Sequence, residues 1–239
     1  MQEGGIAPLN ARAFVLIADV VRSSSVEGFA AERDARLVSL SGRHLVERWI
    51  DVPYTITAWD EFQTVVTGPR EVARVIWGLR LGFFPMHVRI GVGRGSITSM
   101  PEAHEALNAA GSGPAFGRAR EAIEVLKRRA GKYPVLTCFR GAEPNDEAVA
   151  NGILRTIDTL LLRISRRQWE TILEVERLSA QERAAVALGV DASTVSRSLR
   201  RAAYWQVKDA FDLLGAALDV LDHRVRRDAS SAGCTEVSQ

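Results

Sequence analysis

The sequence predicts an α+β protein in two parts, a sheet of short strands interleaved with helices and then a wholly helical part. Three observations support this prediction. Apolar runs too short for helices recur between residues 13 and 139, and segments with helical apolar spacing separate them. The strand pattern then ends, and every later segment up to Arg227 has helical spacing. A cluster of Gly, Pro, Asn and Asp at 141–147 lies between the two parts.

The composition is that of a folded globular protein. The chain has 239 residues, 46% hydrophobic and 25% charged, with a mean hydropathy of -0.03, which excludes disordered and collagen-like chains. Two cysteines, Cys138 and Cys234, exclude a disulfide scaffold. The net charge is only +2, so a surface that binds nucleic acid must be local. Without a signal peptide or an apolar run near the roughly 18 residues of a membrane span, we expect a soluble, cytoplasmic protein that makes no membrane contact.

The first part has the element order of a known sheet. Residues 13–21 form a continuous apolar run, typical of a strand buried on both faces, which only Asp19 interrupts. The predicted order is β-α-β-β-α-β with an extra helix, which matches a ferredoxin-like sheet whose helices cover one face. The expected strands are 13–21, 54–58, 62–66, 86–92 and 134–139, and the expected helices lie in 27–49, from Pro69 to Gly82, and in 114–129.

We therefore expect a ferredoxin-like domain over 1–142, a helical domain over 143–228 and a disordered tail over 229–239. In the helical domain, Ser165 and Ser179 each precede Gln or Glu by three residues, so both are expected to cap helices. Gly189 suits the left-handed end of the second of these helices, and Asp191 is expected to cap a third.

The third helix, 192–203, has two different faces. Its inward residues Val195, Leu199 and Ala202 follow helical spacing, and together with Ala185 and Gly189 they give the pattern of a helix-turn-helix. Residues 160–208 contain nine Lys and Arg against five acids, a local charge of +4. Hydroxyls and guanidinium groups on one helix suit phosphates and base edges of double-stranded DNA. The expected DNA-binding residues are Ser193, Thr194, Ser196, Arg197, Arg200 and Arg201.

The same pattern is also compatible with a helical packing or dimerisation unit whose arginines are merely solvated. An amphipathic stripe follows at 209–221, and it suits either pairing with a second copy or packing on the first domain. Two-fold pairing would fit a symmetric operator, so we expect a homodimer.

Acidic residues mark a second candidate site in the first part. Asp19, near the end of the first strand, and Asp60, at the hairpin tip, are expected to be neighbours because their strands are adjacent. Two carboxylates close together favour a cation, and with phosphate oxygens they suit Mg²⁺, with Glu61 as a third candidate. The alternative is that Asp19 caps a helix and Asp60 makes the turn.

Four segments carry a family resemblance: VLIADVVRSS, AWDEFQ, VRIGVGRGSI and GPAFGRAREA, followed by the helix-turn-helix pattern. In this order they resemble the SatD family of bacterial proteins over nearly the whole chain. More distantly, they are similar to the palm domain of class III nucleotide cyclases and GGDEF-type synthases. That resemblance implies a palm-type domain in which Asp19 and Asp60 hold metal ions over a nucleotide, and it places the arginine of the cyclase helix at Arg120.

Two functional hypotheses follow. The first is a DNA-binding, transcriptional regulatory protein whose palm-like domain binds a nucleotide and a divalent metal or sets the oligomer. The second is a metal-dependent nucleotidyl cyclase or oligonucleotide synthase that the helix-turn-helix targets to DNA, with Asp19, Asp60 and Arg120 as catalytic residues. A scaffold with neither activity is a third alternative.

Overall fold

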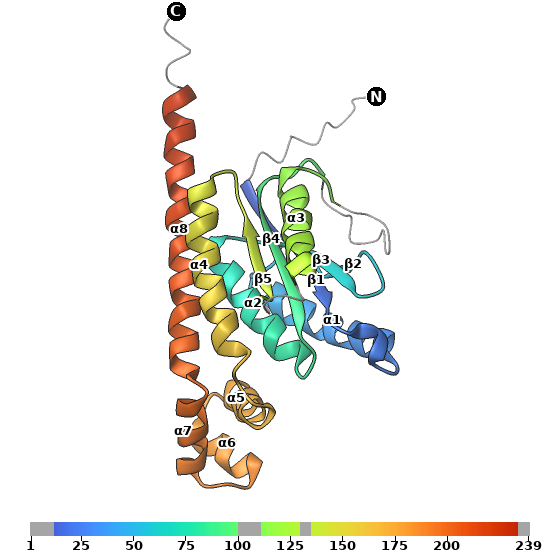
Figure 1. Ribbon diagram of the computed structural model, residues 1–239, viewed down its shortest axis with the longest axis vertical. Helices are drawn as coiled ribbons and strands as arrows, with labels where there is room; N and C mark the ends of the chain where they lie inside the picture. Colours follow the sequence, from blue (N-terminus) through green and yellow to red (C-terminus); the bar gives the residue numbers. More distant parts are fainter. Residues whose placement is uncertain (1–11, 100–110, 130–134, 234–239) are drawn as a thin grey trace, which may run out of the picture.

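The computed structural model describes residues 12–99, 111–129 and 135–233, and within these ranges it has one five-stranded sheet and eight α-helices (Figure 1). The expected α+β class is confirmed. The strands are β1 Arg12–Val20, β2 Thr55–Ile56, β3 Glu61–Val66, β4 Val88–Ser96 and β5 Thr137–Arg140. The helices are α1 Phe29–Val46, α2 Pro69–Phe83, α3 Pro114–Arg129, α4 Pro144–Leu161, α5 Arg166–Leu178, α6 Gln181–Leu188, α7 Ala192–Arg201 and α8 Tyr204–Gly233, and a short 3-10 turn lies at Ser23–Ser25.

The strand order in the sheet is β2-β3-β1-β4-β5. β1 is central and pairs antiparallel with both β3 and β4. β4 and β5 are parallel, because α3 connects the end of one to the start of the other. The first strand therefore has neighbours on both sides, and its sequence is buried from Phe14 to Val20, including Asp19.

Helices cover both faces of the sheet, so the expectation of cover on one face is wrong. Phe14, Leu16 and Ala18 belong to the cluster that packs beneath α1 and α2. Val15 and Ile17 point the other way and pack beneath α3. The second layer arises because α3 follows β4 and crosses to β5 over the free face of the sheet (Figure 1).

Three glycines bring α3 unusually close to β4. Gly91, Gly93 and Gly95 alternate along β4 on the face that α3 covers. A Cβ atom on Gly93 would lie 2.1 Å from the carbonyl oxygen of Ala115 and 2.3 Å from the amide nitrogen of Ala119, both in the backbone of α3. The sequence predicts either close strand packing or a bulge at such a glycine repeat, and the close packing is confirmed.

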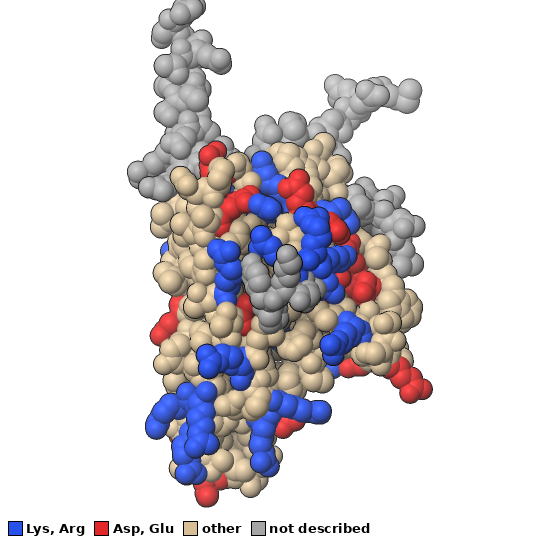
Figure 2. Space-filling view, viewed as in Figure 1, with Lys and Arg blue, Asp and Glu red and all other residues tan. Residues whose placement is uncertain are grey.

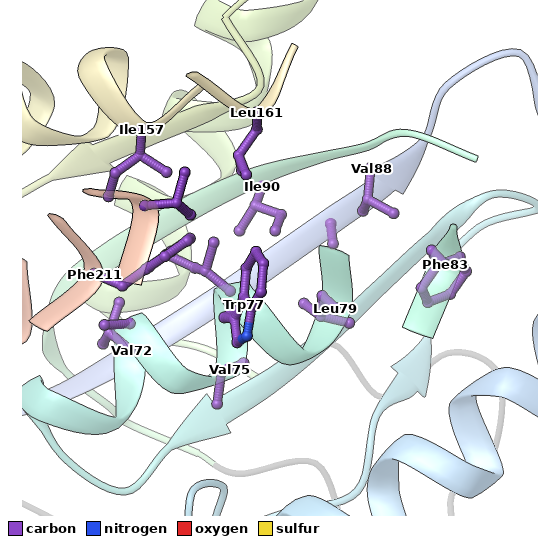
Figure 3. Close-up of a cluster of buried hydrophobic side chains, with 14 of the residues drawn as sticks. Val72, Val75, Trp77, Leu79, Phe83, Val88, Ile90, Ile157, Leu161 and Phe211 are labelled. Atoms are coloured by element: carbon purple, nitrogen blue, oxygen red, sulfur yellow. The ribbon is translucent and has the colours of Figure 1, made fainter. Parts of the chain in front are cut away.

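The core continues from the sheet into the C-terminal helices. Figure 3 shows Trp77 of α2, Ile90 of β4, Ile157 of α4 and Phe211 of α8 in one buried cluster. The domain division at 142/143 stays a prediction. One hydrophobic core contains residues from both sides of this boundary. Helix α8 continues to Gly233, so the segment expected to be a tail from residue 229 begins inside this helix. Within the described ranges, no helix combines the length and apolarity that crossing a bilayer requires.

A histidine lies in the contact between α1 and α2. The His44 side chain is fully buried, and its Nδ1 is 2.8 Å from the Tyr54 hydroxyl. Its Nε2 faces Gly78, where a Cβ atom would lie 2.5 Å away, and it has no hydrogen-bond partner in residues 12–99, 111–129 and 135–233. Burial, and to a lesser extent the charge of Arg43, lowers the pKa of the His44 imidazole from 6.5 to about 4.

His44 is therefore expected to make the fold acid-sensitive. The His44 imidazole takes up a proton near pH 6.5 in the unfolded chain and only near pH 4 in the folded chain. The free energy of unfolding that depends on His44 is therefore at its maximum above pH 6.5 and is lost as the pH falls to 4. The free energy of unfolding should fall by about 2 kcal/mol between pH 7 and pH 5 from this residue. Urea unfolding of His44→Gln should lack this part of the slope, although His87, whose pKa burial also lowers, still contributes. The exposed His223→Gln is the control, and equal slopes in His44→Gln and wild type would contradict the assignment.

Candidate functional site

Two acidic side chains meet across the β1–β3 pair. Asp19 and Glu61 are direct partners in the antiparallel register, and 3% and 7% of their surfaces are exposed. Asp60 lies one residue before β3, where its carboxylate accepts a hydrogen bond of 3.0 Å from the Ser23 hydroxyl. The structure thus brings Asp19 together with Glu61, the residue expected only as a third candidate. Asp60 is close enough to raise the pKa of Asp19.

Basic side chains from two elements compensate these carboxylates. The Arg89 Nε lies 2.8 Å from Asp19 Oδ1, in an orientation that does not make a hydrogen bond. The Lys127 Nζ lies 3.6 Å from one oxygen of Asp19 and 3.6 Å from one of Glu61. Arg120 Nη1 contacts Glu61 Oε1 at 3.2 Å, so the expected Arg120 does belong to this cluster. No pattern in the sequence indicated Arg89 or Lys127.

Burial dominates the electrostatics of Asp19. It raises the pKa of the Asp19 carboxyl above its ordinary value, and the charges of Arg89 and Lys127 offset this only in part. The carboxyl is buried beside a second carboxylate, and the two cations provide the compensation that such a pair needs. This cluster is therefore neutralised by the chain's own side chains.

These contacts do not fit a Mg²⁺ centre. Mg²⁺ demands near-ideal octahedral oxygen geometry and keeps several water ligands. Here the Asp19 and Glu61 oxygens face Arg89, Lys127 and Arg120, and Glu61 Oε1 also accepts a hydrogen bond of 2.9 Å from the Thr57 hydroxyl. Among the residues that the structure describes, no three His, Cys, Asp or Glu side chains are grouped so as to hold a metal.

Helices α5, α6 and α7 form a second candidate site, and Figure 1 shows them together at the end of the molecule away from the sheet. The capping box at the start of α5 is confirmed, with Ser165 and Gln168 each bonding the other's backbone. Gly189 ends α6 with a φ of +64°, as expected. The expectation for Ser179 is wrong: its backbone is left-handed and ends α5, and α6 begins after Ala180. Asp191 stands before α7, but its side chain makes no capping bond.

The apolar sides of the three short helices form a common core. Val195 and Leu199 of α7 are each 1% exposed, and they belong to the same cluster as Ala185 of α6 and Ile172 of α5. Ala202, directly after α7, is buried as well. This packing fixes which side of α7 turns outward.

The outward side of α7 carries the predicted residues. Ser196 is half-buried and the other five are exposed. Arg197 Nη2 donates a hydrogen bond of 3.2 Å to the Thr194 hydroxyl. Among the described residues, Arg197, Arg200 and Arg201 have no ion-pair partner, whereas Arg166 and Arg177 of α5 are paired with Glu170 and Glu174. The exposed predicted residues are Ser193, Thr194, Arg197, Arg200 and Arg201.

A groove separates α7 from the start of α5. It has a volume of about 690 Å³, and Arg167 from α5 lines it opposite Thr194, Arg197 and Arg201 from α7. Figure 2 shows Lys and Arg side chains gathered over this end of the molecule. Arg167 is a member of this surface that sequence analysis did not assign, although its place in the first turn of a capped helix was evident.

One of three comparisons with known proteins identifies a family. The model of the SatD family matches residues 14–202. Among solved structures, this chain is similar to a regulator of polyketide synthase expression from Bifidobacterium adolescentis, with 14% identity over 89% of this chain and 82% of that one. The TM-score of that pair is 0.29, which supports no argument about this chain. No curated protein matches the sequence.

Proposed function

The chain belongs to the SatD family, and we propose that it is a transcriptional regulatory protein that binds double-stranded DNA through a helix-turn-helix formed by α6 and α7. The observation that carries the proposal is the two-sided character of α7. Its apolar side is buried, and its other side holds three arginines that form no ion pair with any described residue. A surface with unpaired guanidinium groups beside hydroxyls suits phosphate oxygens and guanine edges.

The geometry of the turn supports the same proposal. Gly189 to Asp191 join α6 and α7 through one left-handed residue, as in helix-turn-helix motifs. With α7 as recognition helix, Ser193 and Thr194 lie in its first turn, where such helices contact base edges. Arg167 on the far side of the groove is then placed for a backbone phosphate.

The rest of the molecule supports a palm-type domain and a dimer as finer parts of the proposal. The order β2-β3-β1-β4 with antiparallel neighbours is that of the ferredoxin-like sheet, to which α3 and β5 are additions. On α8, Trp205, Leu213 and Val220 are more than half exposed at helical spacing. We propose this stripe as the contact between two copies, so that two α7 helices reach one symmetric operator.

Single alanine variants of α7 test DNA binding. Arg197→Ala and Arg200→Ala should each weaken binding to a duplex selected from a random pool by about 1–3 kcal/mol, if each side chain contacts a base. Fluorescence anisotropy with the full chain at several salt concentrations measures the loss and the stoichiometry. Arg177→Ala is the control, because this exposed arginine pairs with Glu174 on α5 and does not line the groove. The proposal fails if wild type selects no sequence, or if the α7 variants bind like the control.

The alternative, a metal-dependent nucleotidyl cyclase or oligonucleotide synthase, has less support. It needs Asp19 and Asp60 to hold metal ions over a nucleotide, but Asp19 faces Arg89 and Lys127, and Asp60 bonds Ser23. Arg120, its third residue, contacts Glu61. No contact in the cluster favours catalysis over charge compensation, so we do not extend the proposal to an enzyme.

A further inference from the structure

A hollow beside the edge strand of the sheet has the chemistry of an anion site. It lies between the end of α3, β5 and the first turns of α4, and has a volume of about 250 Å³. We call it the β5 hollow. Three arginines, Arg129, Arg140 and Arg155, line it together with a single acid, Glu147. The charged lining residues that the structure describes therefore sum to +2. Within the same described ranges, two of the three guanidinium groups, those of Arg129 and Arg155, have no ion-pair partner.

The acceptors of the β5 hollow are already in use. Both oxygens of Glu147 are engaged, one by Arg140 Nη1 at 2.5 Å and the other by the amide of Gly141 at 3.2 Å. The Asn151 side chain bonds the amide and the carbonyl of Phe139, each at 2.9 Å. The Thr137 hydroxyl bonds Arg80 and Asp158. Each of these acceptors already has a donor, whereas the guanidinium groups of Arg129 and Arg155 have no acceptor among the described residues, so the hollow suits a ligand that accepts hydrogen bonds.

Two further features agree with a negatively charged ligand. Arg140 Nε is buried and has no hydrogen-bond partner within the part of the chain that the structure describes. Burial raises the pKa of the Cys138 thiol, while the charges of Arg140, Arg129 and Arg155 lower it, so the thiol in the lining stays neutral and adds no negative charge. Figure 2 shows further Lys and Arg side chains over the middle of this face of the molecule.

We propose that the β5 hollow binds a small molecule through a phosphate monoester group. A phosphate monoester carries close to two negative charges near neutral pH, which matches the +2 of the lining, and its three free oxygens only accept hydrogen bonds. The guanidinium group is the preferred protein partner of phosphate because its planar donors can pair with two oxygens at once. A ligand held by Arg129 and Arg155 would bridge α3 and α4. The proposal does not depend on DNA binding.

Thermal unfolding of the full chain at about pH 8, above the second pKa of about 6 of a phosphate monoester, tests it. Methyl phosphate should raise the midpoint saturably, beyond the effect of NaCl at equal ionic strength. Dimethyl phosphate, a diester like the DNA backbone, should not. Arg129→Ala and Arg155→Ala should each weaken the apparent affinity for methyl phosphate by about tenfold or more.

Arg128→Ala is the matched control, because Arg128 neighbours Arg129 on α3, is exposed and does not line the hollow. It removes the same charge and should keep the affinity of wild type. The inference is overturned if methyl phosphate acts no more strongly than NaCl, if the diester binds equally well, or if Arg128→Ala weakens binding as much as Arg155→Ala. Since no DNA is present, failure here leaves the DNA-binding proposal standing.

Discussion

Replacing Gly93 with alanine is expected to destabilise the fold by about 4 kcal/mol, at the upper end of the range for single substitutions. The added methyl group would lie 2.1 Å and 2.3 Å from backbone atoms of Ala115 and Ala119. Backbone cannot rotate away as a side chain can, so α3 as a whole must move off the sheet. That movement would also open the packing of Val15 and Ile17 beneath α3.

Urea unfolding followed by circular dichroism measures this loss, and Gly117→Ala is the matched control. Gly117 lies on α3, the helix that packs over Gly93. It is exposed and has open space where a Cβ atom would go. Alanine there should stabilise the fold by about 0.5–1 kcal/mol, because glycine loses more conformational freedom in a helix. If both variants stay within about 1 kcal/mol of wild type, α3 does not lie as close to β4 as described.

The same contact explains how the carboxylate cluster is built. Arg120 and Lys127 lie on α3, seven residues apart and so on one face of the helix. Close packing over Gly91 and Gly93 brings that face down onto Asp19 and Glu61. A Gly93→Ala chain that still folds would therefore also disturb the ion pairs of Lys127.

Local patterns in the sequence predicted much of this fold. The range 114–129 of α3, the turn at Gly189 and the inward residues of α7 depend on helix periodicity and on one glycine, and all three are as expected. Cover on both faces was implied by the apolar run of β1, whereas the ferredoxin-like template implied one covered face. The apolar run of β1 predicted the cover correctly, because side chains on both faces of a strand are apolar only where both faces are buried.

Non-local geometry decided what the sequence did not reveal. Asp60 and Glu61 are consecutive, and which of them faces Asp19 depends on the hairpin register, where a shift of one residue exchanges the two faces. Arg89 lies opposite Asp19 only through the pairing of β1 with β4. Ser179 fits the capping pattern as well as Ser165 does. Its left-handed backbone at the end of α5 has no signature in the sequence.

Replacing Asp158 with alanine is the second large effect that we expect, a loss of about 3–5 kcal/mol. Asp158 is 1% exposed on α4 and accepts hydrogen bonds from the amides of Leu136 and Thr137, at 2.8 Å and 2.7 Å. Its other oxygen lies 3.4 Å from Arg80, which is also buried. The variant would leave a guanidinium group without its counter-charge and two amides without acceptors, all out of reach of water.

A double-mutant cycle separates these two causes. Arg80→Met removes the buried charge while it keeps much of the side-chain volume, so Asp158→Ala should cost less in the Arg80→Met background than in wild type. The remaining cost measures the two amides at the start of β5, which Asp158→Asn should partly restore because it keeps one acceptor oxygen. Strictly additive losses would show that Arg80 and Asp158 do not interact. In that case the contact between α4 and β5 depends on the amide hydrogen bonds alone. The Arg80 guanidinium group is then stabilised by its hydrogen bonds to the Val88 carbonyl and the Thr137 hydroxyl.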